Sequence, residues 1–167
     1  MKRVVGLVHT TRLAVERTHV AVVKELPEYR PMHLLDETLL IGFAETGGVN
    51  AEARRKLLSM VRSAEEAGAA MVLVTCSSLG DAVYEVQRFV DIPVLKIDEP
   101  MAEEVVGSAH TIGILATAPS AVAGTRDLLN REARRAGKDI ELRTFLCADA
   151  NAHLANGMGD FDRYLAR

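Results

Sequence analysis

The sequence has little cysteine, and its two residues of this type, Cys76 and Cys147, follow no recognisable spacing. The N-terminal apolar stretch is short and turns polar at His9, unlike a secretory signal, so we expect free thiols and no disulfide. No apolar run approaches the roughly 20 residues that span a bilayer. These absences exclude a disulfide scaffold and a membrane protein, and they indicate a cytoplasmic location.

The usual signs of nucleic-acid, nucleotide and zinc binding are also missing. The net charge is −3 and the lysines and arginines are scattered, whereas a nucleic-acid surface normally carries a basic patch. Neither GxGxxG nor GxxxxGK[ST] occurs, so the common phosphate-binding loops are excluded. His33, His110 and His153 have no metal-ligand spacing with each other or with the cysteines, so we expect no metal site.

Short β-branched apolar runs alternate with segments of helical period. The runs predict strands at 4–8, 32–35, 71–74, 93–97, 111–115 and 140–145, and the segments predict helices at 13–26, 51–67, 80–90, 100–107, 121–136 and from 161 to 165. Such alternation indicates βαβ units, an α/β fold and a parallel sheet. Pro27 and Pro31 are expected to interrupt the chain before the second strand. A second βα series begins near residue 100, so we predict lobes at residues 1–99 and 100–167.

Ligands of open α/β sheets bind at the carboxyl ends of the strands. Polar residues stand at these positions: His9, Thr10, Thr11, Asp36, Glu37, Thr75, Cys76, Ser77, Ser78, Asp98, Glu99, Thr117 and Ser120. Among them, His9 suits a general acid or base or a donor to the substrate, and a purely structural role is equally compatible. Asp36 and Glu37 suit a substrate amine or a cap on the next segment.

The segment around Cys76 is the most informative part of the chain. An apolar strand ends abruptly at Thr75, Cys76, Ser77 and Ser78, just before the helix predicted at 80–90. A thiol there would face the positive end of the helix dipole, which favours the thiolate, and nearby N–H groups would suit a carboxylate. Alternatively, Cys76 is a small core residue and the serines only cap the helix. The placement favours the functional interpretation.

These motifs resemble the aspartate/glutamate/hydantoin racemase superfamily. The resemblance covers most of the chain and is carried by residues 8–11, 35–37, 74–78, 97–102 and 114–117; its most specific part is Thr-Cys-Ser-Ser followed later by Ile-Asp-Glu-Pro-Met. It implies two similar Rossmann-like (flavodoxin-like) lobes with parallel sheets and a small acid bound between them. It also implies no cofactor and a homo-oligomeric assembly.

The resemblance further implies roles for individual residues. In two-base racemases of this superfamily, one cysteine from each lobe flanks the substrate Cα, and one thiolate removes the proton while the other thiol delivers one. Cys76 matches the first-lobe cysteine. Thr75, Ser77, Ser78 and Thr117 fall where the family's carboxylate-binding hydroxyls and N–H groups lie. With His9 and Thr10, at the end of the first strand, they are the substrate-binding candidates.

The chain departs from the family pattern in its second lobe. The second cysteine normally follows a later strand, which these residues lack, and Cys147 lies too early to match it, so we interpret Cys147 as a core or loop residue. We therefore expect an incomplete second lobe. The favoured function is a cofactor-independent racemase or isomerase of an amino acid or related small carboxylic acid. The alternatives are a single-cysteine decarboxylase or cis–trans isomerase, and a non-catalytic carboxylate-binding domain.

Overall fold

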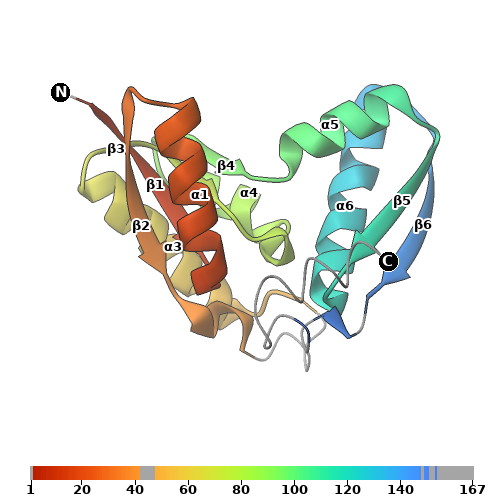
Figure 1. Cartoon of the computed structure of the whole chain (residues 1–167), viewed down its shortest axis with the longest axis horizontal. Helices are drawn as coiled ribbons and strands as arrows, with labels where there is room; N and C mark the ends of the chain where they lie inside the picture. Colours follow the sequence, from red (N-terminus) through yellow and green to blue (C-terminus); the bar gives the residue numbers. More distant parts are fainter. Residues whose placement is uncertain (1, 42–47, 148, 151–152, 154–167) are drawn as a thin grey trace.

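The computed structural model describes residues 2–41, 48–147, 149–150 and 153 of the chain. Six parallel strands form two separate sheets, one of four strands in the order β2-β1-β3-β4 and one that pairs β5 with β6 (Figure 1). The strands are β1 (Arg3–His9), β2 (Tyr29–Leu35), β3 (Ala69–Val74), β4 (Val94–Lys96), β5 (Thr111–Ala116) and β6 (Glu141–Leu146). The predicted α/β class, with two lobes that each contain a parallel sheet, is confirmed. The second sheet has only two strands in the described part of the chain.

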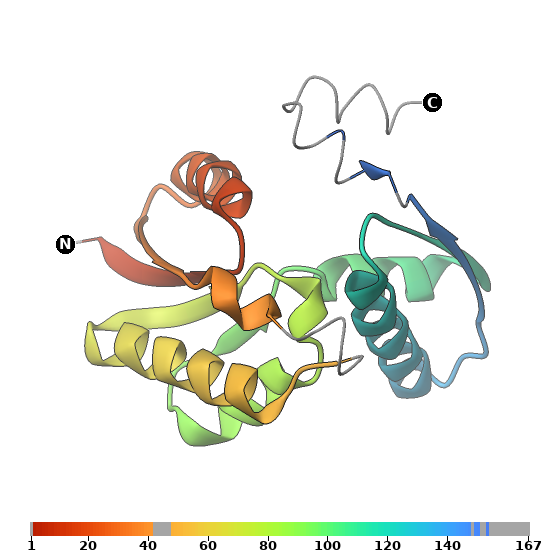
Figure 2. The same cartoon turned by 90° about the horizontal axis from the view of Figure 1, so that it is seen from below.

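Helices cover both faces of the first sheet, as Figure 2 shows for α1 and α3. The helical segments are α1 (Arg12–Glu25), η1 (Glu37–Leu40), α3 (Ala51–Glu66), η2 (Ser77–Leu79), α4 (Ala82–Val86), η3 (Gln87–Phe89), α5 (Glu99–Ser108) and α6 (Pro119–Ala136). Side chains of β1 pack on both faces of the sheet. Val5 and Leu7 pack with Val22 of α1, while Val8 belongs to the core formed with α3 and α4. Because both faces are buried, these strands are almost continuously apolar, as the sequence indicated.

The best-marked helix of the sequence, α3, shows why the prediction succeeded there. The Asn50 side chain accepts a hydrogen bond from the Ala53 N–H at 2.8 Å and so caps the helix. Its buried face includes Leu57 and Val61, at the spacing that the sequence predicted. Gly68 follows the helix with a φ of 83°, in the left-handed region that glycine adopts most easily.

One sequence prediction was wrong, one is confirmed with a change of helix type, and one falls outside the described residues. Pro31 does not interrupt the chain but lies inside β2, where it is tolerated because β2 is an edge strand. The helix predicted at 80–90 is present as α4, which continues directly into the 3₁₀ turn η3; the separate turn η2 precedes it, with Gly80 at a φ of 46° between η2 and α4. The helix predicted from 161 to 165 lies beyond the described part.

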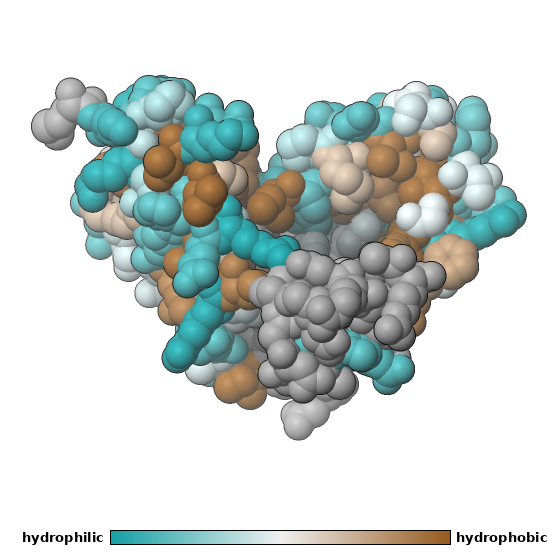
Figure 3. All heavy atoms as spheres, viewed as in Figure 1, coloured by the Kyte–Doolittle hydropathy of each residue, from teal (hydrophilic) through white to brown (hydrophobic). Residues whose placement is uncertain are grey.

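The second lobe packs α5 and α6 against one face of the β5–β6 sheet. Ile112 and Ile114 of β5 are buried there with Val106 and Leu128 of these helices. The space-filling view shows the surface hollowed between the two lobes (Figure 3). Within the described residues, no helix is long and apolar enough to cross a bilayer.

Candidate functional site

Cys76 lies directly after the carboxyl end of β3, one of the two central strands of the first sheet. It is half-buried, packs against the core beside α3 and α4, and carries a free thiol. It directly precedes η2, a turn of three residues, and the helix predicted after it begins only at Ala82. Few peptide dipoles align in so short a turn, so the dipole argument for a thiolate loses most of its force. What remains is the position itself, at the ligand-binding edge of the sheet.

The residue before Cys76 is fixed to the neighbouring strand. The Thr75 N–H donates to the Val8 carbonyl at 3.0 Å, and the Thr75 hydroxyl donates to the same oxygen at 3.1 Å. The Thr75 oxygen also lies 2.9 Å from Nδ1 of His9. Two of the predicted site residues, His9 and Thr75, are therefore in direct contact at the ends of β1 and β3.

His9 begins a row of three histidines. Its Nε2 lies 2.9 Å from Nδ1 of His33 in β2, and Nε2 of His33 lies 3.0 Å from Nδ1 of His19 in α1. His9 is fully buried, His33 is half-buried and His19 is exposed. Burial, followed by the charge of His33, lowers the pKa of His9 to about 4, and burial, followed by the charge of His19, lowers the pKa of His33. The buried end of the row is therefore neutral at pH 7.

This burial predicts a loss of stability in acid. Because the pKa of His9 falls from 6.5 to about 4 on folding, unfolding takes up a proton between these pH values. The stabilisation is complete above pH 6.5 and is lost as the pH falls to 4, by on the order of 2–3 kcal/mol. The titratable group that bears most on His9 is His33 of β2, whereas β3 contributes the neutral Thr75.

Urea unfolding at pH 7 and near pH 4.5 measures this loss. A His9→Gln variant is expected to lose much of the difference between the two pH values, whereas His110→Gln, at an exposed position in the second lobe, is expected to keep it. An equal loss in wild type and His9→Gln would show that other groups dominate the acid response.

The other predicted residues occupy the same edge but differ in exposure. Thr10 is buried just after β1, Ser77 is half-buried and Ser78 is buried in η2. Thr117 is half-buried in the connection between β5 and α6. The structure thus groups the first-lobe candidates at the ends of β1 and β3, while Thr117 belongs to the second lobe.

Helix α6 of the second lobe lies directly against η2. A Cβ at Gly124 would lie only 2.2 Å from the Ser77 carbonyl oxygen, so the two backbones meet at a distance that only glycine permits. Further along α6, the Arg131 guanidinium stacks over the Tyr84 ring at 3.6 Å and lies 3.5 Å from the Asp81 carboxylate. Helix α6 of the second lobe therefore packs against the residues that follow Cys76.

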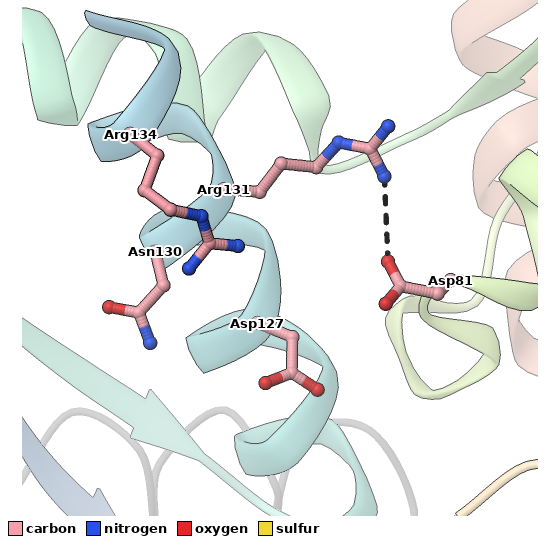
Figure 4. A pocket seen from close by; sticks show the side chains of 5 residues that line it. All are labelled: Asp81, Asp127, Asn130, Arg131 and Arg134. Atoms are coloured by element: carbon pink, nitrogen blue, oxygen red, sulfur yellow. Dashed lines mark ion pairs between the residues drawn. The ribbon is translucent and has the colours of Figure 1, made fainter. Parts of the chain in front are cut away.

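A pocket of about 250 Å³ opens beside this contact (Figure 4). Its lining combines Asp81 of the first lobe with four residues of α6: Asp127, Asn130, Arg131 and Arg134. Arg131 reaches across to Asp81, while the other α6 side chains lie along the helix. Cys76 is not part of this lining, so the pocket belongs to the ion-paired lobe contact rather than to the edge that carries the thiol.

The polar residues after β4 make structural contacts. Glu99 accepts a hydrogen bond of 2.6 Å from the Tyr84 hydroxyl, and burial together with this bond raises the pKa of Tyr84. Lys96 is buried and lies 3.6 Å from Asp98, whose carboxylate oxygens have no hydrogen-bond partner among the described residues. In the described ranges, no three His, Cys, Asp or Glu side chains come together as a metal site.

Three contributors to this region were not predicted from the sequence: His19, His33 and Gly124. His33 was considered only as a metal ligand. A histidine in a strand that pairs with the buried apolar strand β1 was itself a signal of a buried polar contact. Gly124 lies inside a helix, where glycine is unfavourable, and that cost was a signal of close packing.

Comparison with known proteins identifies relatives of this fold. The Asp/Glu/Hydantoin racemase family profile matches residues 7–145. A direct comparison with curated proteins finds no match. Among solved structures, a glutamate racemase from Bacillus anthracis is 15% identical with a TM-score of 0.71, covering 97% of this chain and 59% of its own.

Two further racemases have the same fold. An aspartate racemase from Picrophilus torridus is 12% identical with a TM-score of 0.71, covering 98% of this chain and 73% of its own. A glutamate racemase from Francisella tularensis, solved with D-glutamate, is 14% identical with a TM-score of 0.68, covering 93% of this chain and 57% of its own. The chain thus spans less than two thirds of the length of either glutamate racemase.

Proposed function

Because the chain belongs to the Asp/Glu/Hydantoin racemase family, we propose that it is a cofactor-independent racemase or isomerase of a small carboxylic acid. Cys76 is the proposed catalytic thiolate, and an amino acid is the preferred substrate class. The observation that carries the proposal is the position of Cys76, at the carboxyl end of a central strand and beside the contact between α6 and η2. The Francisella tularensis relative, solved with D-glutamate, supports an amino-acid substrate.

The proposed chemistry begins with proton removal from the substrate Cα. The C–H bond breaks, an S–H bond forms on Cys76, and the electron pair is delocalised into the substrate carboxylate. Hydroxyl and N–H groups at the ends of β1, β3 and β5 would hold that carboxylate; the proposed residues are His9, Thr10, Thr75, Ser77, Ser78 and Thr117. The proton on Cys76 passes to solvent, and a proton from solvent that adds to the opposite face of the carbanion completes the inversion.

A single-thiol reaction is the second candidate, and the placement of the cysteines favours it. Cys147, the other free thiol of the described residues, follows β6, and its N–H donates to the Ala116 carbonyl at 2.8 Å. It does not correspond to the second cysteine of the family motif. A decarboxylase or cis–trans isomerase needs only one thiol, whereas a non-catalytic carboxylate-binding domain needs none.

We also propose a homo-oligomeric, cytoplasmic protein. Leu115 of β5 and Phe145 of β6 are exposed on the face of the second sheet that α5 and α6 leave uncovered. Apolar sheet surface of this kind is often covered by another subunit. The two free thiols are typical of a reducing compartment.

A chiral assay distinguishes racemisation from decarboxylation and from binding alone. Pure L- and D-forms of aspartate and glutamate are incubated with the protein, and both enantiomers are quantified over time. Racemisation converts each enantiomer into the other at constant total concentration, whereas decarboxylation lowers the total. Thermal stabilisation by these acids without any conversion would instead support the binding domain and refute the enzyme.

A further inference from the structure

Two of the three histidines in the row, His19 and His33, have no place in the chemistry described so far. The rings of the row come from β1, β2 and α1. The rings of His9 and His33 are stacked with centroids 5.1 Å apart, and those of His33 and His19 are tilted with centroids 5.2 Å apart. The row runs from exposed His19 to buried His9 and ends at Thr75, the residue before Cys76. The row therefore connects solvent, through three imidazole rings, to the residue beside the proposed catalytic thiol.

The hydrogen bonds of Thr75 determine the direction of the whole row. Because the Thr75 hydroxyl donates its only proton to the Val8 carbonyl, its oxygen must accept from His9, so Nδ1 of His9 carries a proton. In neutral His9, Nε2 is then an acceptor and requires a proton on Nδ1 of His33. The same reasoning makes Nδ1 of His19 the donor to His33. Every Nδ1 is thus a donor that points toward Thr75.

The row cannot reach the thiol directly. Leu73 packs with Leu7 on the α1 face of the sheet, and Thr75, two residues later, contacts His9 on that same face. Cys76 packs against the opposite core, beside α3 and α4. Any effect of the histidines on Cys76 must therefore pass through the backbone at the end of β3.

We propose that His33 is a positioning residue, which holds His9 in its Nδ1–H tautomer and thereby fixes Thr75 and the backbone that carries Cys76. Without the His33 donor, His9 is free to adopt the Nε2–H tautomer. Its Nδ1 then becomes an acceptor, and the Thr75 hydroxyl turns from the Val8 carbonyl to donate to it. The end of β3 loses one of its two hydrogen bonds to Val8, and the orientation of Cys76 is less well defined.

The inference rests on the proposed role of Cys76, but its test needs no substrate. The rate of Cys76 alkylation by iodoacetamide is measured in a Cys147→Ser background, and ¹⁵N NMR of the imidazole nitrogens reports the tautomer of His9. His33→Leu removes the donor, whereas His33→Asn retains an N–H near the position of Nδ1. His110→Asn, in the second lobe, is the control for histidine replacement as such.

We expect a protonated Nδ1 on His9 in the wild type and in His33→Asn, with alkylation rates that agree within about twofold. In His33→Leu we expect mixed tautomers and an alkylation rate changed about fivefold, as the loss of one hydrogen bond predicts. A protonated Nε2 on His9 in the wild-type protein would overturn the inference without any variant. An unchanged alkylation rate in folded His33→Leu would overturn it as well.

These outcomes are independent of those that test the enzyme. If amino acids are not racemised and the alkylation rate still responds to His33, the proposed function fails while the positioning role stands. If racemisation depends on Cys76 and neither tautomer nor alkylation responds to His33, only the positioning role fails. Should the protein be active, His33→Leu is expected to lower kcat more than it raises KM, and His33→Asn is expected to restore kcat.

Discussion

Replacement of Cys76 by serine is expected to lower turnover about 10²–10⁴-fold, the range that a general acid or base contributes. Serine keeps the size and the hydrogen-bonding capacity of the side chain, but its hydroxyl ionises far less readily than a thiol. The thiolate is the reactive form, so the variant would still bind a substrate while failing to remove its proton. The loss should therefore appear in kcat, with little change in KM.

Cys147→Ser is the matched control for this experiment. It makes the same chemical change at the other half-buried free thiol, just after β6, and is expected to retain most of the activity. Both variants should unfold within about 1 kcal/mol of the wild type, since each replaces one atom at a half-buried position. Full activity in Cys76→Ser would eliminate thiol catalysis at this position, and inactivity of Cys147→Ser alone would transfer it to the second lobe.

Gly124→Ala is expected to weaken both stability and activity, against the usual trend for helices. Alanine in place of glycine normally stabilises a helix by up to about 1 kcal/mol. At Gly124 the new Cβ would lie 2.2 Å from the Ser77 carbonyl oxygen and 3.2 Å from its carbon, so backbone has to move. Such overpacking costs about 1–3 kcal/mol, and a displacement of about 1 Å near a reacting group lowers rates by on the order of 10²-fold.

Gly107→Ala isolates the steric part of this effect. Gly107 also lies in a helix, α5, but a Cβ there would meet nothing within 4 Å. Chemical unfolding should show Gly107→Ala to be neutral or stabilised and Gly124→Ala to be destabilised. If the two variants behave alike, the close contact between α6 and η2 is absent in solution.

Local patterns in the sequence predicted most of the fold. The 3.6-residue period and the Asn50 cap located α3, and apolar runs located the buried strands, because these signals depend on neighbouring residues alone. The position of Cys76 at a strand end followed from the same reasoning. Its local environment did not, because the short turn η2 and Gly80, with a positive φ of 46°, separate Cys76 from the helix that follows.

Tertiary contacts account for what sequence reasoning missed. His9 and His33 are 24 residues apart, and only the register that pairs Leu7 with His33 brings their rings together. Gly124 matters because a second-lobe helix lies on Ser77, a contact that no local period encodes. Pro31 in β2 is tolerated because that strand lies at the sheet edge, which is a property of strand order.

The most direct test of the proposed chemistry is hydrogen exchange at the substrate Cα in deuterated water. Pure L- and D-forms of aspartate and glutamate are incubated with the protein, and ¹H NMR follows the Cα signal while chiral chromatography separates the products. Proton removal by Cys76 predicts that the newly formed enantiomer carries deuterium at Cα, in wild type and not in Cys76→Ser. Deuterium incorporation at the same rate in Cys76→Ser, or a product that keeps the original hydrogen, would contradict it.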